Sequence, residues 1–311
     1  MFFKRFLLIF IFINLFYCLY SQRIPLIYNY YNNLLFLNPA YTGSRGILSS
    51  LVFFRNQWIG FDGAPKTFTF SVHTPLKNLN NAIGLNLFSD KIGVTNIKGL
   101  NFNYAYIVKL SYKKNINLSM GLKSGIINSF SEFTSIKINN IMDEVFLKNE
   151  KFTTIDAGFG LFLFSNNYFL SVSLPFLFNY PLNYDKNFYF KNMSDKTFIL
   201  GGGYIIKLSE NFKIFPYLFS FFVSKYKKVV FKNSLIFFDN ISIGTTFSST
   251  LNHNSISLNL EYTMNNKLTI GTSYEFLNLK VEKIANNTLE FFIRYDFLRT
   301  YNLYDTRFFK H

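Results

Sequence analysis

The sequence predicts an all-β fold, a transmembrane antiparallel β-barrel of about fourteen strands. Three observations lead to this class: an apolar N-terminal leader, a very aromatic chain with no helical membrane span after it, and two-residue alternation near the C-terminus. Among the 311 residues there are 42 Phe and 21 Tyr, and aromatic residues make up 21% of the chain. Either a membrane or a very large core must accept these side chains.

The first 21 residues have the pattern of a secretory signal peptide. Lys4 and Arg5 precede the run from Phe6 to Tyr20, which is apolar apart from two residues. A membrane-spanning helix needs about 20 apolar residues, so an uncleaved anchor is the weaker alternative. Bulky residues before Cys18 disfavour lipoprotein processing. After cleavage the chain has no cysteine, which excludes disulfides, a thiolate nucleophile and a Cys-based metal site.

Alternation near the C-terminus favours the barrel over a soluble β-protein. Residues 255–262 alternate polar and apolar side chains, and 268–276 repeat the pattern. In 289–297 only Phe292 departs from it. Strands that are apolar outward and polar inward suit a closed barrel, because lipid cannot satisfy the hydrogen bonds of an open sheet edge. A soluble sandwich also alternates, but it hides its aromatic residues.

Turn signals divide the chain into about fourteen predicted strands, an even number as single-chain bacterial barrels require. They lie near 47–59, 66–75, 82–91, 96–110, 116–128, 152–164, 168–178, 197–208, 211–222, 228–238, 240–250, 255–264, 267–277 and 287–297. The two long connections, 129–151 and 179–196, are predicted to face the outside. They are either binding loops or solvated variable loops.

We predict four parts along the chain: a signal peptide (1–21), an N-terminal segment (22–46), the barrel (47–298) and a C-terminal extension (299–311). The N-terminal segment is aromatic without clear alternation, so we expect it to plug or cap the lumen rather than to form a strand. It ends in the sequence NPAYTGSRG, which contains two turn signals.

Charge and motifs argue against nucleic-acid binding and catalysis. The formal charge of +15 falls by two to +13 without the signal peptide, and lysines occur singly at turns and in short clusters such as Lys113-Lys114. Heavy use of Lys, Asn, Phe, Ile and Tyr is typical of an AT-rich genome. HExxH, CxxC, GxSxG and P-loop motifs are absent, and His73, His253 and His311 are far apart in sequence. We expect no nucleic-acid partner, no metal, no cofactor and no enzymatic activity.

Candidate site residues lie in the stretch between the first turn and the second strand. Arg55 and Gln57 share one strand face, and we expect them to form a hydrogen-bonded cluster with Asp62 and Lys66 that ties the N-terminal turn to the wall. Trp58 is better explained by an interfacial aromatic girdle than by ligand stacking. The structural or partner-docking candidates are Asn38, Pro39, Ala40, Tyr41, Gly43, Ser44, Arg55, Asn56, Gln57, Trp58, Asp62, Gly63, Pro65 and Lys66.

The block 38–96 resembles the signature of the PorP/SprF family, outer-membrane proteins of the type IX secretion system of Bacteroidetes. The likeness continues in 156–160 with 171–175, and again in 203–216. It is weaker near the C-terminus, where Asn287-Thr288-Leu289 precedes Glu290 in place of the family's Gly-Ser/Thr-His.

This resemblance implies a non-enzymatic component of the type IX secretion or gliding machinery in the outer membrane of a Gram-negative bacterium. It implies contact with outer-membrane lipid, and with the periplasmic ring and translocon or with secreted proteins that carry C-terminal signals. Two alternatives from other classes are an outer-membrane channel or hydrophobic-solute transporter, and a surface adhesin. Neither alternative accounts for the block 38–96.

Overall fold

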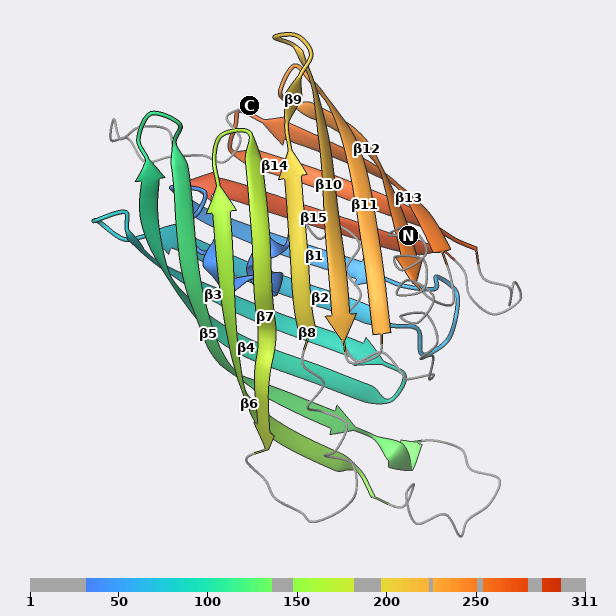
Figure 1. The fold of residues 1–311 in the computed structure, drawn as a ribbon. Helices are drawn as coiled ribbons and strands as arrows, with labels where there is room; N and C mark the ends of the chain where they lie inside the picture. Colours follow the sequence, from blue (N-terminus) through green and yellow to red (C-terminus); the bar gives the residue numbers. More distant parts are fainter. Residues whose placement is uncertain are drawn as a thin grey trace, which may run out of the picture.

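The computed structural model describes residues 32–135, 148–181, 197–223, 226–250, 254–278 and 287–297. The predicted signal peptide and the C-terminal extension lie outside this part. Within it, all strands belong to one antiparallel sheet that curves into a barrel (Figure 1).

Neighbouring strands in the chain are neighbours in the sheet, and β1 pairs with β15 to complete the ring. The strands are β1 (Leu48–Asn56), β2 (Lys66–Pro75), β3 (Asn81–Ile92), β4 (Thr95–Ser111), β5 (Ile116–Ser131), β6 (Glu150–Phe164), β7 (Tyr168–Pro181), β8 (Thr197–Tyr204), β9 (Ile206–Lys207), β10 (Phe212–Val223), β11 (Tyr226–Phe237), β12 (Ile241–Thr250), β13 (Asn254–Met264), β14 (Leu268–Asn278) and β15 (Thr288–Phe297).

The prediction of a barrel of about fourteen strands is confirmed. Both β8 and the two-residue β9 pair with β10 on either side of Ile205, so they form one interrupted wall strand. The closed wall therefore has 14 strands. Each predicted strand overlaps an observed one, and their ends differ by at most three residues.

Alternation places side chains as the sequence indicates. On β13, Ile256 and Leu258 are 53% and 52% exposed on the outer surface, whereas Ser255 and Ser257 are 3% and 1% exposed in the interior. Phe292 departs from the pattern because its ring is fully buried in the lumen. An apolar exterior and a mostly polar interior are what a lipid-facing barrel requires.

The two ends of the barrel differ in their connections. At one end, here the short-turn end, every connection has three to five residues: 76–80, 112–115, 165–167, 208–211, 238–240 and 265–267. The opposite long-loop end carries 57–65, 132–149 and 182–196, so the two predicted long loops share one end, though each is shorter than predicted. Most residues of these two loops lie outside the described part. Because periplasmic turns are short, we infer that the short-turn end faces the periplasm.

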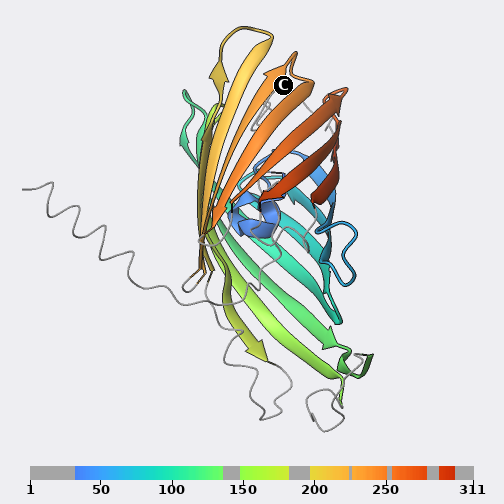
Figure 2. The same cartoon turned by 90° about the vertical axis from the view of Figure 1, so that its right-hand side faces the viewer.

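The described part of the N-terminal segment lies inside the barrel. It contains α2 (Leu34–Leu37) and the 3-10 helix η1 (Pro39–Tyr41), and Figure 2 shows it surrounded by wall strands. Every side chain of α2 is at most 2% exposed. A second 3-10 helix, η2 (Phe133–Ser135), follows β5. That the segment closes the lumen stays a prediction, because residues 22–31 lie outside the described part.

Candidate functional site

The turn at Asn38-Pro39 is built by its own side chains. Asn38 Oδ1 accepts a hydrogen bond from the Ala40 amide at 2.9 Å, and Thr42 Oγ1 donates to the Pro39 carbonyl at 2.7 Å. Asn is a preferred residue before a helical turn because its side chain satisfies a free amide. Gly43 has a φ of 76°, a left-handed conformation that glycine accepts without strain. This local chemistry gives residues 38–43 a defined shape.

Two wall glycines make room for this turn. A Cβ on Gly121 of β5 would overlap the backbone of Pro39 and Ala40, and a Cβ on Gly160 of β6 would overlap the Asn38 side chain. In turn, Asn38 Nδ2 donates to the Leu161 carbonyl at 2.9 Å and to Ser171 Oγ at 2.8 Å. Residues of the second stretch of family likeness, Gly160 and Ser171, thus contact the N-terminal turn directly.

Wall side chains also form hydrogen bonds with backbone groups of α2 and of the turn that follows it. Side chains of β3 and β7 donate to α2 carbonyls: Asn86 to Leu35 at 3.1 Å and Ser173 to Leu37 at 2.8 Å. The Gly43 amide donates to His73 Nδ1 at 3.0 Å. Buried backbone groups need such partners, so the interior of the wall is fitted to this segment.

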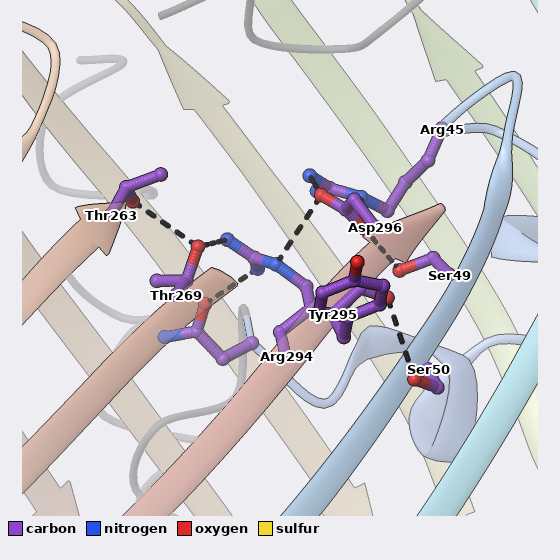
Figure 3. Close-up of polar contacts among 9 residues, drawn as sticks. Arg45, Ser49, Ser50, Thr263, Thr269, Arg294, Tyr295 and Asp296 are labelled. Carbon is purple, nitrogen blue, oxygen red and sulfur yellow. Dashed lines mark hydrogen bonds and ion pairs between the residues drawn. The ribbon is translucent and has the colours of Figure 1, made fainter. Parts of the chain in front are cut away.

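A charged anchor fixes the segment to the last strand. Arg45 donates through Nε and Nη2 to the two carboxylate oxygens of Asp296, at 3.1 and 2.5 Å, and Ser49 Oγ donates to the same carboxylate at 2.6 Å (Figure 3). A two-point arginine–carboxylate pair fixes both distance and orientation. Tyr295, next to Asp296, accepts through its carbonyl from Ser50 at 3.4 Å.

A second anchor lies at Asn32, the first described residue. Its side chain accepts from Arg294 Nη1 at 3.2 Å and donates to Glu261 Oε1 at 3.0 Å. Glu261 also pairs with Lys232 Nζ of β11 at 2.8 Å, and Arg294 donates to Thr269 at 3.2 Å (Figure 3). One chain of polar contacts thus connects β11, β13, β14 and β15 to the N-terminal segment.

The predicted cluster of Arg55, Gln57, Asp62 and Lys66 is wrong. Lys66 pairs in register with Asn56 on the outer face, whereas Arg55 points into the lumen opposite Thr67. Asp62 and Lys66 are exposed. Adjacent residues of a strand point to opposite faces, which separates Lys66 from Arg55.

Arg55 instead joins a buried group of acids. Its Nη1 lies 2.8 Å from Glu290 Oε1, and its Nη2 lies 3.7 Å from Glu275 Oε2, with all three side chains at most 2% exposed. Lys228 of β11, itself 1% exposed, interacts electrostatically with all three. We call the lumen faces of β1, β13, β14 and β15, with Lys228 and Lys232 of β11, the ionic half.

The other candidates of this stretch lie around the β1–β2 loop at the long-loop end. Trp58 is half-buried, has an unusual φ of 50° and packs edge-on against Phe61 at a ring distance of 6.3 Å. Gln57 is buried, and its backbone N–H donates to the Pro65 carbonyl at 3.0 Å. Gly63 and Pro65 shape the turn, while Tyr41 and Ser44 are buried with the N-terminal motif. Whether Trp58 belongs to an aromatic girdle stays a prediction.

The opposite side of the lumen is rich in aromatic rings, although it also contains the buried pair of Lys123 on β5 and Asp156 on β6. Rings from β6, β7 and β10 pack on one another, with Phe162, Phe169 and Phe219 fully buried and ring centroids 5.8 to 6.0 Å apart along this row. Tyr41 of the N-terminal motif joins them through Phe162 at 5.5 Å. We call the lumen faces of β6, β7, β8 and β10 the aromatic half.

Glycines on neighbouring strands accept the large lumen rings. A Cβ on Gly201 would overlap the Phe219 ring, its partner in the β8–β10 register. The same arrangement joins Gly271 to Phe292, which explains the break in the alternation of the last strand. Glycine in a wall strand therefore lets a bulky lumen side chain approach the neighbouring backbone closely.

Several functional residues did not stand out in the sequence. Asn32, Arg45, Glu261, Arg294 and Asp296 anchor the N-terminal segment, yet they are up to 262 residues apart in sequence. The sequence feature that could have identified most of them is a charged side chain at a strand position that the alternation places in the lumen. Buried charges need partners, so such residues must find one another inside the barrel.

Two further findings concern the described residues only. No helix among them is long and apolar enough to cross a membrane. They also contain no group of three or more His, Cys, Asp or Glu side chains that could hold a metal ion.

The chain is similar to several solved structures. The CymD monoaromatic hydrocarbon channel is 9% identical, with a TM-score of 0.49, and the match covers 86% of this chain and 93% of that one. Omp33 of Acinetobacter baumannii is 10% identical with a TM-score of 0.46, covering 81% and 99%. A FadL homologue of Pseudomonas aeruginosa is 9% identical with a TM-score of 0.43, covering 81% and 89%. We infer no function from scores at this level.

Comparison of sequences gives the decisive result. No curated protein matches the chain. The family model described as "Type IX secretion system membrane protein PorP/SprF" matches residues 19–295, which include the whole wall up to Tyr295. With its closed outer-membrane barrel and the seated NPAYTG turn, the chain belongs to the PorP/SprF family of type IX secretion system membrane proteins.

Proposed function

We propose that this protein is a non-enzymatic outer-membrane component of the type IX secretion or gliding machinery, which docks core components or helps deliver particular secreted proteins to the surface. The family match over residues 19–295 carries the proposal. The wall and interior form a rigid platform, and the connections at its two ends provide the docking surfaces. Within the proposed arrangement, residues 1–21 are removed on export, and 22–46 hold the lumen closed.

The contacts inside the barrel favour a docking role rather than a channel role. The N-terminal segment touches both the aromatic half, through Tyr41 and Phe162, and the ionic half, through Arg45 and Asp296. The buried pair Arg55–Glu290 joins the adjacent strands β15 and β1, and Lys232–Glu261 joins β11 to β13. An aqueous channel needs a hydrated path, and the described part of the N-terminal segment lies in that space (Figure 2).

The periplasmic ring and translocon would meet the short-turn end. Exposed lysines lie there on two turns, among them Lys77 on 76–80 and Lys113 and Lys114 on 112–115. At the long-loop end, exposed Lys66, Lys91 and Lys98 offer a matched set of three. Rim charges mainly control association rates and partner choice, so reversing them weakens docking without unfolding the barrel.

The test is affinity purification of the tagged protein from the outer membrane after mild crosslinking, with partners quantified by mass spectrometry. We expect recovery of machinery proteins, and a loss of that recovery in K77E/K113E/K114E but not in K66E/K91E/K98E. Loss of surface-delivered proteins in the second set alone would assign the client-specific role. Recovery of a barrel with no machinery or client protein would refute the proposal, and conductance in a planar bilayer would then test the channel alternative.

A further inference from the structure

Three exposed lysines on neighbouring strands form a group on the outside of the wall, at its long-loop end. They are Lys66 of β2, Lys91 of β3 and Lys98 of β4, and we call them the lysine cluster. The register places them on one face: Lys66 is paired with Lys91, and Lys98 is paired with Ser89, two residues before Lys91. Ser89 is also paired with Phe68, which is 44% exposed, so this face is the outer one.

The lysines are close enough for their charges to repel one another. Residues directly opposite in an antiparallel pair have Cβ atoms about 4.5–5.5 Å apart, and diagonal neighbours are about 7–8 Å apart. Lys66 and Lys91 are directly opposite, and Lys91 and Lys98 are diagonal. Like charges in opposite positions destabilise a sheet. The arrangement therefore favours an anion that lies between the ammonium groups.

Carboxylates of the described residues do not supply that anion. Asp90 follows Ser89 in the chain but faces the lumen, where it accepts from Thr67 at 2.6 Å. Asp62 and Glu132 are exposed in the connections beyond the strand ends. Within the described part of the chain, no ion pair joins either of them to the lysine cluster. The charge of the cluster is thus available to an external group.

Asn96 adds an uncharged donor between two of the lysines. It is paired with Lys91 and precedes Lys98 by two residues on β4. Ser89 Oγ donates to Asn96 Oδ1 at 3.3 Å, which leaves the two Nδ2 hydrogens of Asn96 for another acceptor. Ammonium and amide donors around one point suit a phosphate group, whose oxygens accept several strong hydrogen bonds.

The position of the cluster indicates that this phosphate belongs to a lipid. Towards the middle of the wall, the outward-facing side chains of β3 and β4 become apolar, with Leu87 39% and Phe102 61% exposed. The apolar band of an outer-membrane barrel ends where the headgroups begin. Side chains at outward-facing strand positions extend sideways from the wall into that layer, whereas a protein partner at this end would meet the loops.

We propose that the lysine cluster binds a phosphate of lipid A, the membrane anchor of lipopolysaccharide. The short-turn end faces the periplasm in our assignment, so the cluster lies at the outer leaflet, where lipid A is the phosphorylated lipid. Groups of basic side chains at a membrane surface attract anionic headgroups, with a gain in affinity from each lysine. The proposal depends on this orientation of the barrel and not on the secretion role.

Lys227 provides a matched control on the other side of the barrel. It is exposed at an outward-facing position of β11, at the same end of the wall, but its register partner on β10 is Phe222. Lys91→Gln and Lys227→Gln therefore remove the same charge, one at the centre of the cluster and one away from it. Both residues are exposed, so neither change disturbs the packing of the lumen.

The experiment titrates the purified mature protein in detergent micelles with lipid A, and native mass spectrometry gives the Kd. EDTA is present, because divalent cations would otherwise bridge phosphates to carboxylates. We expect one bound lipid A, a roughly fivefold higher Kd in Lys91→Gln, a rise of at least roughly twentyfold in K66Q/K91Q/K98Q, and no change in Lys227→Gln. Dephosphorylated lipid A and phosphatidylglycerol should bind the wild type as weakly as lipid A binds the triple variant.

Thermal unfolding adds a readout in which the sign of the effect changes. Without lipid A, Lys91→Gln removes a repulsion and should raise the melting temperature above that of the wild type. With saturating lipid A, the wild type should melt at the higher temperature, because it gains more from the bound ligand. An equal Kd in the wild type and the triple variant would overturn the proposal. An equal Kd for lipid A and either of the two comparison lipids would also overturn it.

Discussion

The ionic and aromatic halves of the lumen hold the same barrel by different means. In the aromatic half the contacts are made by rings: Phe219 packs over its register partner Gly201 and against Phe169 of β7. In the ionic half, Lys232 reaches from β11 to Glu261 on β13, and Arg55 of β1 pairs with Glu290 of β15 across the closure of the ring.

This difference predicts how each half fails. Removing one partner of a buried ion pair leaves a charge without compensation, which costs several kcal/mol. A conservative change of a packed ring to a smaller apolar side chain leaves no buried charge without a partner, so it should cost less. The N-terminal segment contacts both halves, so its own anchors should have an intermediate effect. Four variants test this order.

The largest effect is expected for Arg55→Met. It leaves Glu275 and Glu290 buried without their arginine partner, and we expect the free energy of unfolding to fall by about 3–5 kcal/mol. The measurement is urea unfolding in detergent, in which the folded fraction is read from the difference in gel mobility between unheated and heated samples. Phe221→Leu in the aromatic half is the comparison and should cost less than about 1.5 kcal/mol. Equal losses would mean that water already compensates these charges.

A smaller loss is expected for Gly201→Ala. The new methyl group meets the Phe219 ring in the lumen, and overpacking of this kind costs about 1–3 kcal/mol. Gly202→Ala is one residue away but faces lipid, so the same measurement should give almost no change. The double variant Gly201→Ala/Phe219→Leu should recover most of the loss. If it does not, the glycine serves backbone geometry rather than the ring.

Asn38→Ala should loosen the N-terminal segment more than the wall. It removes the cap of Ala40 and the bonds to Leu161 and Ser171, at about 1–2 kcal/mol. Because the mature chain is predicted to lack cysteine, a cysteine introduced at Ala40 reports on the segment by its maleimide labelling rate. We expect labelling to rise roughly tenfold. Ser50→Ala, which touches only the Tyr295 carbonyl, is the control and should label like the parent.

The smallest effect is expected at the rim. Lys213 pairs with Asp239, whose side chain is 27% exposed at the short-turn end, so Asp239→Asn should cost about 0–1 kcal/mol and lose that effect in high salt. Asp156→Asn is the buried counterpart, since its partner Lys123 is 1% exposed and lies over the Phe176 ring at 4.0 Å. It should cost about 3 kcal/mol at any salt concentration. A similar loss in both variants would show that burial does not control these pairs.

Part of the site was readable along the chain. Asn38 and Gly43 have local roles in a turn, and local chemistry does not depend on the rest of the fold, so the turn was predicted correctly. Asp62 and Lys66 were placed wrongly because proximity in sequence was taken for proximity in space. The alternation of β1 and β2 already assigned Arg55 and Lys66 to opposite faces.

The sequence by itself determined the strands, their inward and outward faces and the class of barrel, because a lipid exterior imposes a period of two on every wall strand. It also contained the motif by which the family is identified. Only the tertiary structure decided which lumen residues meet. Arg45 and Asp296 are 251 residues apart, and they pair because β1 closes on β15. Closure, register and the seating of the N-terminal segment are properties of the whole ring, and no local pattern encodes them.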